Sequence, residues 1–179
     1  KRKASDEIFY MKNEPTLPDF FYTENVSREE LFKHVKTSPI ILLADKPKSG
    51  KTVALKQVWK NLTKTGRYVK YFALEEQQDL LLEEDDDFLT FATKLMTKVQ
   101  ERLTFEEFLN RGEATIIFDG INDKFDSTKL IKILKSFKTL KNNQLWIGSS
   151  EMIGDKVESE VSPVRIKLAL ITDEEERIF

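Results

Sequence analysis

The sequence has no cysteine and only one histidine among its 179 residues. The lack of cysteine excludes disulfide bonds, zinc sites built on thiolates and catalysis by a thiol, and it suits a reducing compartment. No apolar run approaches the roughly 20 residues that a membrane-spanning helix needs. The formal net charge of −2 gives no overall attraction to nucleic acid or to an anionic membrane, so we expect neither as a partner. We expect a cytoplasmic protein.

The hydrophobic content of 40%, with 13 phenylalanines, is enough for one buried core. We expect a polar lead-in over residues 1–25 and one domain over residues 26–179, and we expect this domain to be a fragment of a longer multidomain protein. The aromatic residues Phe20, Phe21 and Tyr22 lie near the end of the lead-in. They predict either packing at the edge of the domain or a surface on which an adenine base stacks.

The most informative stretch is an apolar strand, Ile40–Ala44, that leads through a polar loop into an amphipathic helix. The sequence Gly50-Lys51-Thr52 opens the helix, and this order of strand, loop and helix is the context of a P-loop. Gly50 allows a tight turn, Lys51 supplies a cation for the β- and γ-phosphates, and the Thr52 hydroxyl is a ligand for Mg²⁺. The residues expected to bind the nucleotide here are Asp45, Lys46, Pro47, Lys48, Ser49, Gly50, Lys51 and Thr52.

This P-loop departs from the usual pattern at its start. Asp45 stands where the first glycine is expected, and Lys48 stands where many such loops carry another glycine. A carboxylate at this position repels phosphate, which Lys46 and Lys48 partly offset. We therefore expect a reduced affinity for nucleotide.

A second motif lies on the strand predicted over Ala114–Gly120, which ends in an acidic residue, Asp119. This is the form of a Walker B segment, whose carboxylate holds Mg²⁺ through water. The strand predicted over Gln144–Gly148 is followed by Ser149, which we expect to contact the nucleotide from the same edge of the sheet.

Five predicted strands are separated by helices, which favours an α/β fold with three layers, α/β/α, around a five-stranded, mainly parallel sheet. The predicted strands cover residues 40–44, 68–74, 114–120, 144–148 and 164–168. Helical spacing also predicts helices after Ser27, over Phe88–Val99 and over Phe105–Asn110. We expect the acidic run Glu83–Asp87 to be a solvated loop and His34 to be a surface or packing residue.

Four segments together resemble a NACHT domain, the signalling NTPase of the STAND class. Ser49–Thr52 resembles the second half of the NACHT P-loop, and Ile117–Asp123 is similar to the distinctive Walker B of the family. Leu145–Ser150 resembles the sensor 1 strand, and Val164–Phe179 resembles the return strand and the helix after it. The resemblance implies binding of ATP or ADP with Mg²⁺, self-association controlled by nucleotide, and further domains that sense a trigger.

The resemblance also assigns the catalytic positions, and there the sequence departs from the family. Asn122 stands at the second acid, and its carboxamide cannot accept a proton from an attacking water molecule. Asp123 replaces a glutamate and is one methylene shorter. Ser150 stands where the sensor arginine is expected, which removes a cation from the region of the γ-phosphate. We therefore expect a regulatory nucleotide-binding module that hydrolyses ATP slowly or not at all, at most a weak ATPase.

Two other functions remain open from the sequence. The substitutions in the motifs also fit a pseudo-NTPase scaffold that binds no nucleotide and acts through protein–protein contacts. A small-molecule kinase is the third hypothesis, but such an enzyme needs an arginine-bearing lid over the phosphates. Arg165 and Arg177 are the only arginines after Asp119, and they form no cluster in the sequence.

Overall fold

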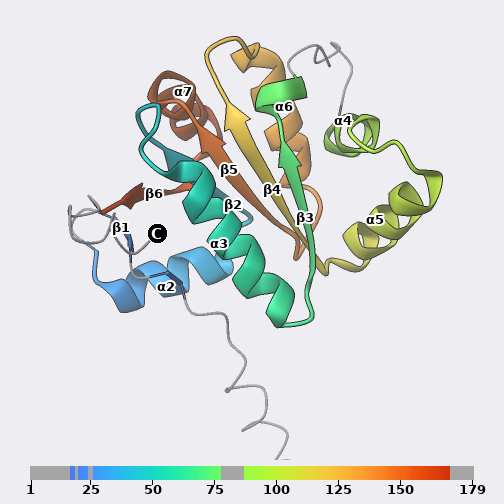
Figure 1. The fold of residues 1–179 in the computed structure, drawn as a ribbon, viewed down its shortest axis with the longest axis horizontal. Helices are drawn as coiled ribbons and strands as arrows, with labels where there is room; N and C mark the ends of the chain where they lie inside the picture. Colours follow the sequence, from blue (N-terminus) through green and yellow to red (C-terminus); the bar gives the residue numbers. More distant parts are fainter. Residues whose placement is uncertain (1–16, 19, 24–25, 78–86, 170–179) are drawn as a thin grey trace, which may run out of the picture.

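The computed structural model describes residues 17–18, 20–23, 26–77 and 87–169. Within these ranges the chain forms a six-stranded sheet with the order β1-β6-β2-β5-β4-β3 (Figure 1). The strands are β1 (Phe21–Tyr22), β2 (Ile40–Ala44), β3 (Tyr68–Ala73), β4 (Ala114–Ile121), β5 (Gln144–Ser149) and β6 (Val164–Leu168). All five strands from β2 to β6 pair in parallel. The predicted α/β class and mainly parallel sheet are confirmed.

The predicted number of five strands is one too low. The additional strand, β1, pairs antiparallel with β6 through Phe21 opposite Leu168 and Tyr22 opposite Lys167. A strand of two residues carries no alternating pattern that a sequence can show, and it forms here because the edge of β6 offers it partners. Phe21 is buried, and its ring centroid lies 6.0 Å from that of Trp146. The ring of Phe21 therefore belongs to the core and is not available to stack on a base.

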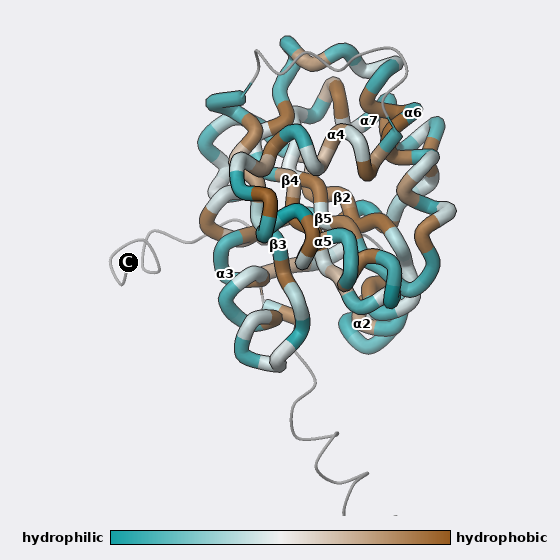
Figure 2. Tube along the Cα trace, turned by 90° about the vertical axis from the view of Figure 1, so that its right-hand side faces the viewer, coloured by the Kyte–Doolittle hydropathy of each residue, from teal (hydrophilic) through white to brown (hydrophobic). Residues whose placement is uncertain are grey.

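Each face of the sheet is covered by helices, and Figure 2 shows hydrophobic strands enclosed between them. The helices are α2 (Arg28–Thr37), α3 (Lys51–Lys64), α4 (Phe88–Lys94), α5 (Val99–Arg111), α6 (Ser127–Phe137) and α7 (Glu151–Val161), with a short 3₁₀ helix, η1 (Glu75–Gln77). One core cluster joins one face of the sheet to α4, α5, α6 and α7, and the other joins the opposite face to α2 and α3. The expected three layers are present.

The segment predicted as one helix over Phe88–Val99 is divided in the structure. Helix α4 ends at Lys94, and α5 begins at Val99. The turn between them is held by Arg102, whose Nε donates a hydrogen bond of 2.8 Å to the main-chain oxygen of Met96. Val99 is 70% exposed, so its place in the predicted apolar stripe was wrong. The apolar spacing of the sequence continues across residues 95–98, so it does not mark the end of α4.

Two further differences concern helices near the P-loop strand. The spacing of Trp59 from Leu55 and Leu62 predicts that it lies on the buried face of α3, but it is 43% exposed. Helix α7 has no counterpart among the predicted elements. It begins after Ser150, whose hydroxyl accepts a hydrogen bond from the main-chain amide of Ile153. Among the described residues, none of the helices has the length and apolar character that crossing a bilayer requires.

Candidate functional site

The loop between β2 and α3 turns through two residues with positive φ, Lys48 and Gly50. Gly50 precedes the helix with φ of 93° and ψ of 10°, a left-handed conformation that favours glycine. Lys48 also has a positive φ, of 62°. No side chain caps the first turn of α3, so its main-chain amides are free to bind an anion. The loop and the start of the helix are together the candidate anion cradle.

The cation of this cradle is Lys51, whose Nζ turns back toward the loop. It donates hydrogen bonds to the main-chain oxygen of Asp45 at 2.8 Å, to the main-chain oxygen of Lys46 and to the hydroxyl of Ser49 at 3.3 Å. Burial lowers the pKa of Lys51 below its usual value. The carboxylates that oppose this shift in the pKa of Lys51 belong to Asp45, Asp119 and Glu151. The ammonium group therefore lies between the loop and the acidic residues of the site.

Asp45, at the position of the missing glycine, directs its side chain to the backbone of its own loop. Its Oδ1 accepts a hydrogen bond of 2.7 Å from the main-chain amide of Lys46. The main-chain amide of Asp45 donates to the main-chain oxygen of Ser149 at 3.3 Å, which ties the loop to the end of β5. The carboxylate thus helps to shape the loop, and it still adds a negative charge at the mouth of the cradle.

The candidate Walker B residue, Asp119, lies on β4, which is separated from the P-loop strand by β5. Its side chain is 5% exposed. A β-carbon at Gly148 of β5 would lie 2.9 Å from Oδ1 of Asp119 and 2.6 Å from Cδ1 of Leu55 on α3. Gly148 therefore marks the point where the P-loop helix and the carboxylate come together above β5.

These residues fit a bound magnesium nucleotide. The Thr52 hydroxyl and the Asp119 carboxylate are oxygen donors, which Mg²⁺ prefers, and phosphate oxygens and water complete its octahedron in sites of this kind. The described residues contain no group of three or more His, Asp or Glu side chains that could hold a metal alone, so the ion would depend on the nucleotide. Thr52 is exposed on the first turn of α3, where a ligand can reach it.

The three residues that follow from the resemblance are engaged in local contacts. Oδ1 of Asn122 accepts a hydrogen bond of 3.0 Å from the main-chain amide of Lys124, which closes a turn. The exposed carboxylate of Asp123 accepts a hydrogen bond from the hydroxyl of Ser150. Asp123 therefore lies at the carboxyl edge of the sheet beside the start of α7, as its position after β4 requires.

Ser149 is 1% exposed, and its hydroxyl donates to the main-chain oxygen of Ser150 at 3.0 Å. A β-carbon at Gly154 of α7 would lie 3.3 Å from this hydroxyl oxygen, which shows how closely α7 covers it. The structure thus places Ser149 at the predicted edge but gives its hydroxyl a partner within the protein.

Two residues of the site had no functional role in the sequence-based interpretation. Tyr71 of β3 donates a hydrogen bond of 2.5 Å to Oδ2 of Asp119. Glu151, at the first position of α7, acts electrostatically on Lys51. Neither belongs to a motif, and no signal in the sequence brings β3 or α7 to the P-loop.

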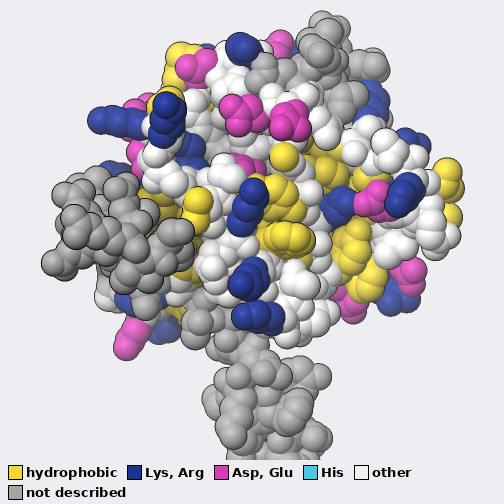
Figure 3. Space-filling model, viewed as in Figure 1, with side chains coloured by type: hydrophobic (Ala, Val, Ile, Leu, Met, Phe, Trp, Pro, Cys, Tyr) yellow, Lys and Arg dark blue, Asp and Glu magenta, His cyan; other side chains and the backbone are white. Residues whose placement is uncertain are grey.

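Charge is distributed unevenly over this side of the molecule. Helix α3 contains no acidic residue, and its lysines are Lys51, Lys56, Lys60 and Lys64. Figure 3 shows a row of Lys and Arg side chains in dark blue over α3, with acidic side chains in magenta above them near the ends of the strands. A positive helix beside the cradle favours the approach of an anion such as a nucleotide.

No protein-family model matches the sequence, and no curated protein matches it either. Two similar solved structures carry the titles "Crystal structure of DNA replication initiation factor" and "The structure of a DnaB-like replicative helicase and its interactions with primase". The first has a TM-score of 0.47 and 16% identity, and the match covers 92% of this chain and 52% of that one. The second has a TM-score of 0.40 and 12% identity, with 82% and 46% covered.

The chain thus spans about half the length of each of these structures. The fold itself follows from the chain's own geometry. In this parallel sheet β5 lies between the P-loop strand β2 and the Asp119 strand β4, with helices on both faces, so the loop after β2 and Asp119 lie at the same edge of the sheet.

Proposed function

We propose that this chain is the regulatory nucleotide-binding module of a STAND-type signalling protein, similar to a NACHT domain, and that it binds ATP or ADP with Mg²⁺. The observation that carries the proposal is that two parts of the chain far apart in the sequence, the start of α3 and the end of β4, come together above β5. The free amides of α3, the ammonium of Lys51 and the carboxylate of Asp119 meet there. Each has the chemistry that one part of a magnesium nucleotide needs.

The same site supports binding better than hydrolysis. An attacking water molecule needs a base, and Asn122 offers only a carboxamide whose oxygen is bonded to the amide of Lys124. The neighbouring carboxylate of Asp123 is engaged by Ser150. Hydrolysis is also favoured by a cation near the γ-phosphate. Arg165, the one arginine after Asp119 in the described part of the chain, instead forms ion pairs with Asp155 and Glu158 on α7. Slow or absent hydrolysis suits a switch whose state depends on which nucleotide is bound.

The test is calorimetric titration of the protein with ATP and with ADP in the presence of Mg²⁺. Lys51→Ala is expected to weaken binding roughly 10- to 100-fold, the size expected when a charged hydrogen-bond donor is lost. Lys56→Ala is the matched control, because Lys56 is an exposed lysine of the same helix outside the cradle. Equal affinities for the wild type and Lys51→Ala would overturn the proposal.

The signalling role has a test of its own. If the module is a switch, ATP with Mg²⁺ should promote self-association of the full-length protein, and ADP should not. Analytical ultracentrifugation with each nucleotide measures this directly. If the full-length protein stays monomeric with ATP and with ADP, the proposed switch is wrong, although the module can still bind nucleotide.

One observation favours a second candidate, the pseudo-NTPase scaffold. Lys51 has three acceptors within its own loop, in Asp45, Lys46 and Ser49, so its ammonium group has hydrogen-bond partners without a phosphate. The first of these bonds is made to the main-chain oxygen of Asp45 and not to its carboxylate, so any residue at this position would accept it. Absence of nucleotide binding by calorimetry and by a second method would select the scaffold.

A further inference from the structure

Tyr71 and Asp119 face the same side of the sheet from neighbouring strands. Tyr71 lies opposite Ile117 in the parallel pairing of β3 with β4. Side chains alternate along a strand, so Ile117 and Asp119 share one face, and Tyr71 shares it with them. This is the face that α3 covers. The hydroxyl of Tyr71 can therefore reach Oδ2 of Asp119, and it donates a hydrogen bond there at 2.5 Å.

The carboxylate of Asp119 needs such a donor. It is 5% exposed, and an ionised carboxyl group taken out of water is unstable unless hydrogen bonds replace the lost hydration. In the described part of the chain, Tyr71 is the only side chain that donates a hydrogen bond to it. Burial, followed by the hydrogen bond to Asp119, raises the pKa of Tyr71 far above its usual value, so the phenol keeps its proton and remains a donor.

The two oxygens of this carboxylate point in different directions. Oδ2 is directed toward β3, where the Tyr71 hydroxyl holds it. Oδ1 lies toward β5, since a β-carbon at Gly148 would approach it within 2.9 Å. In the sheet order, β5 separates β4 from the P-loop strand β2. Oδ1 is thus the oxygen on the side of the P-loop.

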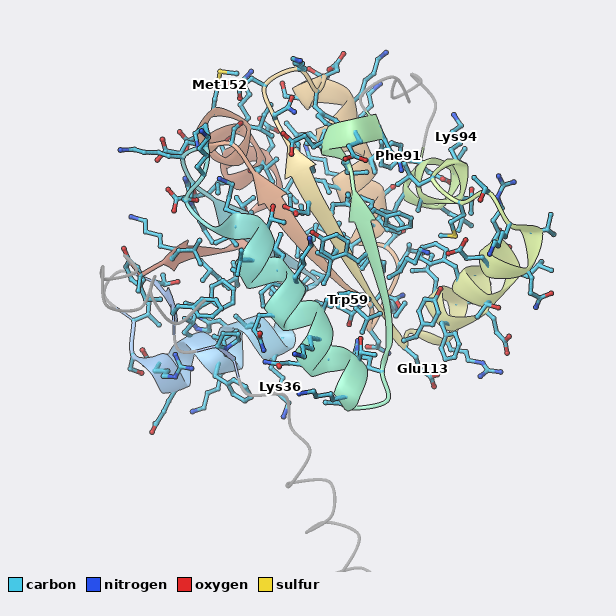
Figure 4. All side chains as sticks on the ribbon, in the orientation of Figure 1. Lys36, Trp59, Phe91, Lys94, Glu113 and Met152 are labelled. Carbon is cyan, nitrogen blue, oxygen red and sulfur yellow. The ribbon has the colours of Figure 1, made fainter. Side chains whose placement is uncertain are left out.

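The ring of Tyr71 is itself held in place. Its centroid lies 5.9 Å from that of Trp59, at an interplanar angle of 43°. Figure 4 labels Trp59 where α3 lies next to β3. Trp59 is 43% exposed and has no polar contact with the site, so it acts on Tyr71 by packing. The phenol is therefore fixed by an aromatic neighbour on α3 and by the carboxylate on β4.

We infer that Tyr71 is a positioning residue for magnesium: its hydroxyl orients Asp119 so that Oδ1 faces the P-loop. The inference rests on the proposed binding of a magnesium nucleotide. Without the hydroxyl, the buried carboxylate loses its donor and turns more freely, so Oδ1 faces the P-loop for less of the time. Partners that orient a metal ligand in this way typically change metal affinity 10- to 100-fold when they are removed.

The test is the affinity of Tyr71→Phe for ATP as a function of free Mg²⁺, measured beside its affinity in EDTA. We expect the affinity in EDTA to match the wild type and the Mg²⁺ concentration for half-maximal enhancement to rise about tenfold. Tyr68→Phe is the matched control, because Tyr68 is also on β3 but its ring stacks on Phe108. This variant should behave as the wild type. Thermal unfolding without ligand shows whether each variant is folded.

A double-mutant cycle separates positioning from a general loss of stability. In the background of Asp119→Asn, the Tyr71→Phe change should have no further effect on the Mg²⁺ dependence. A Tyr71→Phe effect of equal size with and without Mg²⁺, or no effect at all, would overturn the inference and leave nucleotide binding intact. If the wild type binds no nucleotide, the proposed function and this inference both fail.

Discussion

Gly148 has no side chain beside the carboxylate of Asp119, and a β-carbon at position 148 would lie only 2.9 Å from Oδ1 of Asp119. The same β-carbon would lie 2.6 Å from Cδ1 of Leu55 on the P-loop helix. One position on β5 thus controls how closely the two halves of the candidate site approach.

Gly148→Ala should therefore destabilise the fold by about 1–3 kcal/mol through overpacking and weaken the binding of magnesium nucleotide. Urea unfolding and calorimetry measure the two effects. Gly66→Ala is the control: nothing lies within 4 Å of its β-carbon, and its φ of 78° is strained for alanine by roughly 1–2 kcal/mol. It should cost stability without a change in nucleotide affinity. Normal stability and binding in Gly148→Ala would contradict this account of the site.

The charge of Asp45 should lower the affinity for nucleotide. Asp45→Asn removes the charge and keeps an oxygen that can accept the hydrogen bond from Lys46, so it isolates the electrostatic effect. We expect it to raise ATP affinity about fivefold, which corresponds to about 1 kcal/mol for one charge near the phosphates in water. The gain should shrink at high salt, since exposed charges are then screened. An affinity that is unchanged or lower in Asp45→Asn would show that the carboxylate matters only for the shape of the loop.

Replacing the two catalytic positions together should increase turnover. Asn122→Asp restores a carboxylate, and Asp123→Glu extends the second acid by one methylene, so the double variant has a candidate base near the edge of the sheet. We expect ATP hydrolysis to rise by about tenfold or more, still below the roughly 10²- to 10⁴-fold of a well-placed base. The same pair combined with Lys51→Ala should show no increase. If the double variant hydrolyses ATP as slowly as the wild type, the residues at positions 122 and 123 are not the cause of the slow hydrolysis.

Asp87 should make stability depend on pH at acidic values. Hydrogen bonds to its carboxylate, above all from the main chain of Thr90, lower the pKa of Asp87 below 3.8 in the folded protein. The stabilisation is therefore complete above 3.8 and is lost as pH falls through the folded-state pKa of Asp87. Asp87→Asn caps α4 without titrating, so its stability relative to the wild type should rise only in that acidic range. Urea unfolding across this range checks the prediction, and Asp87→Ala should cost about 1 kcal/mol at neutral pH. A constant difference between the wild type and Asp87→Asn at all pH values would contradict it.

Local patterns were sufficient for much of the fold. The predicted strand Val164–Leu168 has the bounds of β6, and the strand predicted over Gln144–Gly148 is one residue shorter than β5. Both are short apolar or alternating runs between turn residues, so the signal is contained within the segment. The division between α4 and α5 was missed, and the turn that divides them contains a hydrogen bond from Arg102 to the main-chain oxygen of Met96. Such a contact has no trace in the spacing of apolar residues.

The sequence by itself determined the order of strand, loop and helix around Lys51, the apolar strand that carries Asp119, and the α/β class, because each is a property of consecutive residues. The tertiary structure alone decided the order of the strands, and with it the register that sets Tyr71 opposite Ile117 and so beside Asp119. It also placed Gly148 between Asp119 and the P-loop helix. These relationships join residues far apart in the chain, and their physical cause is the pairing and packing of whole strands and helices, which no short segment encodes.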